Sequence, residues 1–459
     1  MSESKSPFPT SDPVNLGGAV PGIRSRAALD RAATLIHGAE PASRSTVPIV
    51  LAGKKGSILT DVDGNRFIDF VGGWGSTPLG ADHPRVMAAA VEGLHRYSVE
   101  NTDYVPAEPL STFAEALLSV APSSLSRVAY EVSGTETVET ALKLMRAATG
   151  RPWIISFFGQ YHGESYAAQA LSAQQAEFHG GMRHLMPGYL HVPYPDPSRC
   201  VFRHDGPCDG TCVTEWIRER LCFHVVPPEE IAGVVIEPII GEGGVLTPPP
   251  AFWSELDELR RSHGWLLTLD EVETGMGRTG RLFAADHWEL QPDLMCLAKG
   301  LSGGALPLGA VLMSEAVAEA TDGVHTGGTW AGQPAACLAA RESLRIITAE
   351  GVLDNVAILE GIARDALEPL RAASPIVADI RIRGLYLAVE FMDPATGRRA
   401  PEISARVHQR CVRMGLIGIQ DDVAHYRGLP ALNMEPELFS AAMEILSAAI
   451  TEVGRDLDE

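Results

Sequence analysis

The chain lacks the features that mark membrane, secreted and nucleic-acid-binding proteins. It has no run of about 18 apolar residues that could cross a bilayer. Its N-terminal segment, MSESKSPFPTSDPVN, is polar and has no apolar core of the kind found in signal peptides. The formal net charge is −21, and no long lysine and arginine cluster interrupts it, which disfavours nucleic acids and anionic membranes as partners. We therefore expect a cytoplasmic protein, and the charge does not decide whether it acts on a small substrate.

Cysteine is scarce, with seven in 459 residues, so a disulfide scaffold is not expected. Four of the seven lie between positions 200 and 222, and the series Cys200, His204, Cys208 and Cys212 contains four possible zinc ligands. The series lacks the C-x2-C spacing of zinc knuckles, and nearby glycine and proline residues indicate an irregular loop. We favour reduced thiols or contacts within the loop and no metal, with a bound metal as the alternative.

The pattern of apolar runs predicts an α/β protein with two domains, because 459 residues exceed one ordinary core. Strand-like runs alternate with amphipathic helical stretches, which predicts βαβ units and a mostly parallel sheet flanked by helices. These runs are 128–132, 153–157, 231–236, 265–269 and 294–297. We predict a frayed N-terminal arm over 1–45 and a large domain over 76–345. A small α+β domain is expected over 46–75 and 346–459.

The smaller domain has its own expected elements. A hairpin is predicted over 49–70, because alternating residues flank the turn signal DVDGN at 61–65. The later expected elements are a helix at 353–370, a strand pair at 377–383 and 385–391, a helix near 402–414, and a last helix from about 436.

Two neighbouring strand ends carry the most informative residues. Asp270 follows the run 265–269, and Lys299 follows the run 294–298. A carboxylate and a lysine at such positions are what pyridoxal 5'-phosphate chemistry requires. The lysine amine condenses with the cofactor aldehyde, and the carboxylate keeps the pyridine nitrogen protonated. The Gly-Arg-Thr-Gly turn at 277–280 strengthens this interpretation.

A phosphate site is predicted where Ser133, Gly134 and Thr135 follow a strand and open a helix. Ser133 and Glu136 have the spacing of a capping box. The buried face of this helix is predicted at Val138, Ala141, Leu142 and Met145. A well-capped helix is the simpler interpretation, but free N–H groups at a helix N-terminus also bind anions, and Gly134 lets the backbone approach closely. Together with the lysine and the aspartate, phosphate binding is favoured.

Several motifs together resemble a known family. They are SGTETVETALKLMR (133–146), FGQYHG (158–163), EPIIGEGG (237–244), LDEVETGMGRTG (269–280), AKG (298–300) and TGGTWAGQPAAC (326–337). The set resembles the class III, fold-type I pyridoxal-phosphate-dependent aminotransferases, and the resemblance covers most of residues 45–450. The most similar members are the 4-aminobutyrate and ornithine aminotransferases and their amino-acid racemase relatives.

The resemblance implies roles for residues around the cofactor ring. Lys299 matches the Schiff-base lysine, which also moves the proton between Cα and the cofactor C4′. Asp270 matches the carboxylate on the pyridine nitrogen. Val272 matches the apolar residue beneath the ring, and Tyr161 matches the aromatic stacked above it.

The resemblance also implies how the phosphate is held. Ser133, Gly134 and Thr135 match the phosphate-binding turn. Thr329 matches a phosphate contact that comes from the neighbouring subunit. A homodimer with shared active sites is therefore expected.

On the substrate side, the resemblance implies a gate. Glu242 matches a glutamate that pairs with an arginine, here Arg427, and Trp74 is assigned to the same substrate site. With Glu242 turned away, Arg427 would bind a substrate α-carboxylate in bidentate fashion. With the pair closed, an ω-amine could approach instead. An exposed arginine in a loop is the alternative for Arg427.

Two positions depart from the family pattern. Glu164 stands where 4-aminobutyrate enzymes have an arginine that grips the distal carboxylate, so an acidic substrate side chain would be repelled and a cationic or neutral amine is favoured. Glu273 stands where many relatives have a glutamine bonded to the cofactor phenolic oxygen. An ionised Glu273 beside a phenolate would be costly, so we expect it to carry a proton or to point away.

The expected activity is transfer of an amino group from an amino acid or amine to an α-keto acid or aldehyde by a ping-pong mechanism. An amino-acid racemase or epimerase on the same scaffold is the alternative, because it would need the same motifs. A decarboxylating transaminase is less favoured, and a regulator is disfavoured because the N-terminal extension offers no DNA-binding module.

Overall fold

A computed structural model describes residues 14–100, 104–180, 187–202, 207–420 and 423–458. The described chain forms two compact units, each with its own core. The smaller unit comprises the described residues up to Gly73, Leu79–His83 and those from Asp354 onward. The larger unit comprises Trp74–Pro78 and the described part of Pro84–Leu353.

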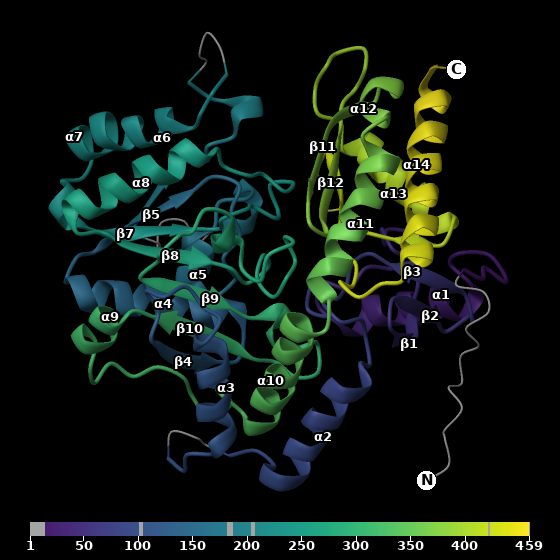
Figure 1. Cartoon of the computed structure of the whole chain (residues 1–459). Coiled ribbons are helices and arrows are strands. Elements are labelled where there is room, and N and C mark those ends of the chain that lie inside the picture. Colours follow the sequence, from purple (N-terminus) through teal and green to yellow (C-terminus); the bar gives the residue numbers. More distant parts are fainter. Residues whose placement is uncertain (1–13, 101–103, 181–186, 203–206, 421–422, 459) are drawn as a thin grey trace. The chain divides into compact units, whose positions relative to one another are not determined.

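The larger unit is built on a seven-stranded sheet with the strand order β4-β10-β9-β8-β7-β5-β6 (Figure 1). The strands are β4 (Arg127–Glu131), β5 (Trp153–Phe157), β6 (Tyr189–Val192), β7 (Ile231–Ile236), β8 (Leu266–Asp270), β9 (Leu294–Leu297) and β10 (Gly309–Met313). β10 is antiparallel to both its neighbours, and the pairs from β9 to β6 are parallel. The predicted α/β fold with a mostly parallel sheet is confirmed.

Two helices cover opposite faces of this sheet, α4 (Gly134–Thr149) and α8 (Pro250–His263). Ile154 of β5 lies in the apolar cluster formed with Leu142 and Met145 of α4. Phe157 of the same strand makes an edge-on contact with Phe252 of α8, at 6.0 Å between ring centroids. Because successive strand side chains point to opposite faces, α4 and α8 lie on different sides of β5.

The other helices of the larger unit are connections around this sheet. They are α2 (Pro84–Tyr97), α3 (Glu108–Leu118), α5 (Tyr166–Leu171), α6 (Thr211–Trp216), α7 (Cys222–His224), α9 (Glu315–Ala320) and α10 (Pro334–Ala349). The predicted buried face of α4 is confirmed, because Val138, Ala141, Leu142 and Met145 are all buried.

The smaller unit contains two sheets. One has the order β1-β2-β3-β13, and the other has the order β11-β12-β14. The strands are β1 (Leu51–Lys55), β2 (Ile58–Asp61), β3 (Arg66–Asp69), β11 (Val377–Arg383), β12 (Tyr386–Phe391), β13 (Leu416–Ile417) and β14 (His425–Gly428). The predicted hairpin and strand pair are both present, whereas β13 and β14 were not predicted.

The helices of the smaller unit follow the predicted pattern in the C-terminal part. They are α1 (Ile23–Leu35), most of α11 (Val352–Leu367), α12 (Leu370–Ala373), α13 (Pro401–Arg413) and α14 (Pro436–Asp458). Helix α1 was not predicted. Asp63 in the hairpin turn accepts the N–H groups of Arg24 and Ser25 at 2.9 and 2.8 Å, so this part of the arm is ordered.

Helices α2 and α10 approach closely at Gly93. A Cβ on Gly93 would lie 2.4 Å from Ala335 Cα, so no side chain fits without moving a helix. We predict that Gly93→Ala lowers the free energy of unfolding by about 1–3 kcal/mol in urea titration, because overpacking outweighs the better helix propensity of alanine.

The matched control is Gly361→Ala in α11, where a Cβ meets no atom within 4 Å. There the same change should raise the free energy of unfolding by up to about 1 kcal/mol. Stabilisation by both substitutions would contradict the close helix contact.

Candidate active site

A pocket of about 160 Å³ lies beside the carboxyl ends of strands in the larger unit. It is lined by eight residues predicted for the site, Ser133, Gly134, Thr135, Tyr161, Asp270, Val272, Glu273 and Lys299, and by His162, Gly163 and Glu237. The parallel register brings them together: Asp270 at the end of β8 pairs with Cys296 of β9, and Lys299 follows β9 by two residues.

The N-terminus of α4 forms one wall of the pocket. The predicted capping box is present, because Glu136 N–H donates to Ser133 Oγ at 3.3 Å and Ser133 N–H donates to Glu136 Oε2 at 3.1 Å. These bonds leave the N–H groups of Gly134 and Thr135 in the first helical turn for an anion. A Cβ on Gly134 would lie 2.7 Å from Val272 Cγ1, so a larger residue would push into the pocket.

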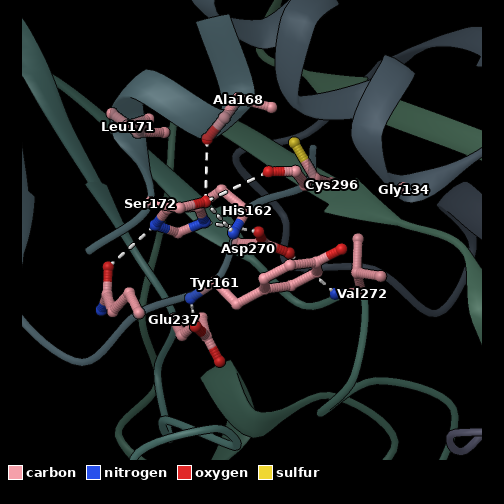
Figure 2. Close-up of polar contacts among 12 residues, drawn as sticks. Gly134, Tyr161, His162, Ala168, Leu171, Ser172, Glu237, Asp270, Val272 and Cys296 are labelled. Atoms are coloured by element: carbon pink, nitrogen blue, oxygen red, sulfur yellow. Dashed lines mark hydrogen bonds and ion pairs between the residues drawn. The ribbon is translucent and has the colours of Figure 1, made fainter. Parts of the chain in front are cut away.

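Asp270 is held by a buried histidine. His162 Nδ1 lies 2.7 Å from Asp270 Oδ2, and the other ring nitrogen lies 3.0 Å from Gln160 Oε1 (Figure 2). Asp270 Oδ1 also accepts the N–H of Val272 at 3.1 Å. A histidine that donates from Nδ1 to a carboxylate fixes the direction in which the carboxylate points. The sequence offered only an isolated Tyr-His pair, so this role of His162 was not predicted.

Glu237, at the end of β7, anchors the turn that carries Tyr161. Its carboxylate accepts the N–H groups of Tyr161 at 2.8 Å and Gly241 at 3.1 Å. Burial, followed by the nearby charge of Asp270, holds the pKa of Glu237 well above its usual range. Glu237 was also not among the predicted site residues, although it opens the motif EPIIGEGG.

Carboxylates gather around the hydroxyl of Tyr161. This hydroxyl donates to Glu164 Oε1 at 3.2 Å. Burial raises the pKa of Tyr161, and the charges of Glu164, Glu242 and Glu273 raise it further. The side of the pocket next to Tyr161 is therefore electronegative.

Lys299 and Glu273 form an ion pair within the pocket, with 3.0 Å between Nζ and Oε2. Glu273 does not point away from the site, so that part of the expectation is wrong. Lys299 itself has φ 40°, in the left-handed region that non-glycine residues rarely adopt. Such strain costs about 1–3 kcal/mol and typically marks functional positions.

Five predicted residues are not among those that line the pocket. Trp74 is 43% exposed, with φ 57°. Glu164 is exposed next to Tyr161, and Glu242 is half-buried and close enough to affect the Tyr161 hydroxyl. Thr329 is exposed, and its carbonyl accepts a bond from Gln333. Arg427 is fully buried in β14 of the other unit, so it is not the exposed loop arginine of the alternative interpretation.

Comparisons with known proteins agree on one family. The family model described as "Aminotransferase class-III" matches residues 40–450. The chain is 32% identical to an alanine/serine racemase of Pyrococcus horikoshii over 88% of this chain and 86% of that protein. It is 37% identical to an acetylornithine aminotransferase of Methanopyrus kandleri over 76% and 82% of the two chains.

Among solved structures, an amine transaminase from an uncultivated Pseudomonas species, in its PLP-bound form, superposes with a TM-score of 0.85. It is 28% identical, and the alignment covers 92% of this chain and 98% of that one. Within the described residues, no helix is long and apolar enough to cross a membrane.

Glu271, next to Asp270, fixes the loop after β8. Its carboxylate accepts the hydroxyl of Thr274 at 2.6 Å and the N–H groups of Ala284 and Ala285 at 2.8 and 2.7 Å. Burial raises its pKa to about 7 from the ordinary value of 4.5. The folded chain therefore retains a proton that the unfolded chain releases at lower pH.

We predict that the titration of Glu271 lowers the free energy of unfolding as pH rises between about 4.5 and 7. The total decrease should be about 3 kcal/mol at most, and Glu271 should have no further effect above about pH 7. Glu271→Gln cannot titrate, so its urea midpoint should fall less steeply over this range than that of the wild type. Parallel pH profiles for the two proteins would contradict the raised pKa.

Proposed function

The chain belongs to the class III aminotransferases, and we propose that it moves amino groups from neutral or cationic amines and amino acids to an α-keto acid or aldehyde. The observation that carries this substrate preference is the group of carboxylates around the Tyr161 hydroxyl. An acidic substrate side chain would meet like charges there, whereas a cationic one would be attracted.

The residues present fit pyridoxal phosphate. The uncapped N–H groups of Gly134 and Thr135 would hold its phosphate, with Ser133 beside them, and the tight contact between Gly134 and Val272 leaves room only for backbone there. Tyr161 and Val272 would enclose the ring. When bound, the cofactor supplies an aldehyde that condenses with amines and a pyridinium ring that stabilises negative charge at Cα.

Side chains of the pocket would orient the cofactor and carry protons. Asp270 would hold a proton on the ring nitrogen, and His162, bonded to Asp270 at 2.7 Å, would orient that carboxylate. The Lys299 amine would carry the proton to and from the substrate Cα. Glu273, at 3.0 Å from Lys299 Nζ, would hold the lysine in place whenever its amine is free.

Arg427 and Glu242 are proposed to select the substrate carboxylate, with Trp74 in the same substrate site. A guanidinium group can bind a carboxylate through two parallel hydrogen bonds, which suits an α-keto acid acceptor. Glu242 would pair with Arg427 when the substrate has no carboxylate near the reacting amine. The support for this pair is the match of both residues to the family motif.

We also propose a cytoplasmic homodimer in which Thr329 contacts the phosphate bound by the partner. The support for the dimer is the position of Thr329 in the motif TGGTWAGQPAAC, where relatives share this contact. The seven cysteines are free thiols in the structure, and free thiols persist in a reducing compartment.

Racemisation is the second candidate, because a relative 32% identical to this chain is an alanine/serine racemase. A racemase would use Lys299 in the same way but would need a second group to exchange a proton on the opposite face of Cα. Tyr161 lines the pocket and is the candidate for that group, but the raised pKa of its hydroxyl disfavours the ionised base.

Removing the lysine tests the cofactor link. We predict that Lys299→Ala abolishes the covalent attachment and lowers kcat by at least roughly 10³-fold, because both the amine and the proton carrier are lost. Intact mass after borohydride reduction should show the added cofactor in the wild type and in the exposed-site control Lys55→Ala. A reducible adduct that survives in Lys299→Ala would refute the assignment.

Charge reversal tests the substrate preference. We predict that Glu164→Arg raises kcat/KM for donors with an ω-carboxylate by roughly 10-fold relative to neutral donors, and that Glu164→Gln gives a smaller change. Glu229→Arg, the same reversal at an exposed position in the 3-10 helix Pro228–Glu230, serves as the control. An unchanged ratio in Glu164→Arg would mean that Glu164 does not act on the substrate.

Arg427 can be tested by comparing two half-reactions of one variant. Arg427→Ala should slow the half-reaction with an α-keto acid by roughly 10- to 100-fold, which corresponds to a lost charged hydrogen-bond pair. The half-reaction with a simple amine should change little, which also shows that the variant is folded. Equal losses in both half-reactions would remove Arg427 as the carboxylate ligand.

A further inference from the structure

Three cysteines outside the pocket converge on one point. The sulfur of Cys212 lies 3.6 Å from the sulfurs of Cys200 and Cys208, and all three sulfurs lie within 4.8 Å of one another. His204, the fourth residue of the series in the sequence, lies outside the described residues. Free thiols in contact with one another within the loop are what we expected from the sequence, and the structure adds that three of them share one site.

The spacing of the sulfurs fits a tetrahedral metal centre. With zinc–sulfur bonds of 2.3 Å and tetrahedral angles, two sulfur ligands lie about 3.8 Å apart. A disulfide would need about 2.05 Å, so Cys212 is bonded to neither neighbour in this structure. Cys212 is buried at 7% exposure, whereas Cys200 and Cys208 are half-buried, so an ion could enter from the exposed side.

The described part of the segment around the cysteines has little regular secondary structure. Between β6 and α6, the described residues contain only one short element, the 3-10 helix Pro197–Arg199. Connections of this length without secondary structure are uncommon in compact domains and are usually functional. The cysteines flank the later part of the segment: Cys200 directly follows the 3-10 helix, and Cys212 lies in the first turn of α6.

Local hydrogen bonds fix the backbone at both ends of the segment. Asp196 accepts the N–H of Ser198 at 2.9 Å, and Asp209 accepts the N–H of Thr211 at 3.1 Å. At Gly210, with φ 82°, a Cβ would lie 3.1 Å from both Phe252 and Pro195, so the turn before Cys212 is closely packed. The sulfurs are therefore presented by constrained backbone, which favours a preorganised site.

We propose that Cys200, Cys208 and Cys212 bind one zinc ion and that this ion cross-links the chain after the 3-10 helix Pro197–Arg199 to the start of α6. Thiolate ligands select soft or borderline metals over magnesium and calcium. Each thiol gives up a proton as its sulfur binds the metal, so binding releases up to three protons. Three protein ligands leave one coordination position for water or another ligand.

Metal analysis of the full-length holoenzyme tests the site. After dialysis against zinc and then zinc-free buffer, plasma emission should give about one zinc per chain for the wild type and near zero for Cys212→Ser. Cys222→Ser removes a thiol from the same part of the chain but outside the cluster, and it should retain the metal. Zinc absent from the wild type, or lost equally in Cys222→Ser, would overturn the proposal.

A second measurement covers the case in which Cys212→Ser fails to fold. Cys208→Ser removes a half-buried thiol instead, and it should also lose the metal. A strong chelator should lower the Tm of the wild type and of Cys222→Ser but leave that of Cys208→Ser unchanged, because only the first two carry the cross-link. A chelator effect that survives in Cys208→Ser would contradict the site, as would a disulfide among the three cysteines in non-reducing peptide mapping.

Discussion

The bond between His162 and Asp270 is the interaction on which the geometry of the pocket depends. Both side chains are buried, and a buried carboxylate is costly unless hydrogen bonds replace its water. Here the carboxylate has His162 on one oxygen and the N–H of Val272 on the other. The position of Val272 beneath the proposed ring site is therefore coupled to the direction in which Asp270 points.

The parallel strands of the sheet bring Asp270 and the residues around it to one place. Asp270 ends β8, and the turns after β5 and β7 supply His162 and Glu237. Because these strands are parallel, their carboxyl ends meet at one edge, where ligands bind in open α/β sheets. Lys299 lies at the same edge, and its backbone there is in the strained left-handed region. Placing its amine in the pocket therefore costs conformational free energy.

Negative charge beside Tyr161 is the observation on which the proposed substrate preference rests. Glu164, Glu242 and Glu273 all act on the Tyr161 hydroxyl, and Glu273 is paired with Lys299. If Lys299 binds the cofactor as proposed, Glu273 would lose this positive partner, and its negative charge would then favour the proposed cationic substrates. Two of these residues, Glu164 and Glu273, are the positions that depart from the family pattern in sequence.

Much of the fold and of the pocket could be predicted because the sequence patterns that indicate them involve residues close together in the chain. The runs at 153–157, 231–236 and 294–297 match β5, β7 and β9 in full, and the capping box at Ser133 follows from spacing alone. Strand direction is not local, so the antiparallel β10 could not be inferred from its apolar sequence. The contact of His162 with Asp270 joins residues 108 positions apart and left no pattern in the sequence.

The cysteine cluster shows the same limit. Spacing argued against a zinc knuckle, because the ligands of such a knuckle come from one tight turn. The structure instead brings together Cys200, which follows the 3-10 helix Pro197–Arg199, and Cys212 in the first turn of α6, twelve positions later. The spacing of cysteines in the sequence therefore predicts metal sites whose ligands share one turn. It does not predict sites whose ligands are brought together by the folding of a longer loop.

The most direct test of the account is to mix the holoenzyme with an amino donor in the absence of any acceptor. Transamination predicts that the aminated form of the cofactor accumulates to about one equivalent per active site, together with the keto product. The contradicting result is that no aminated cofactor accumulates while the donor inverts at Cα and takes up deuterium from the solvent.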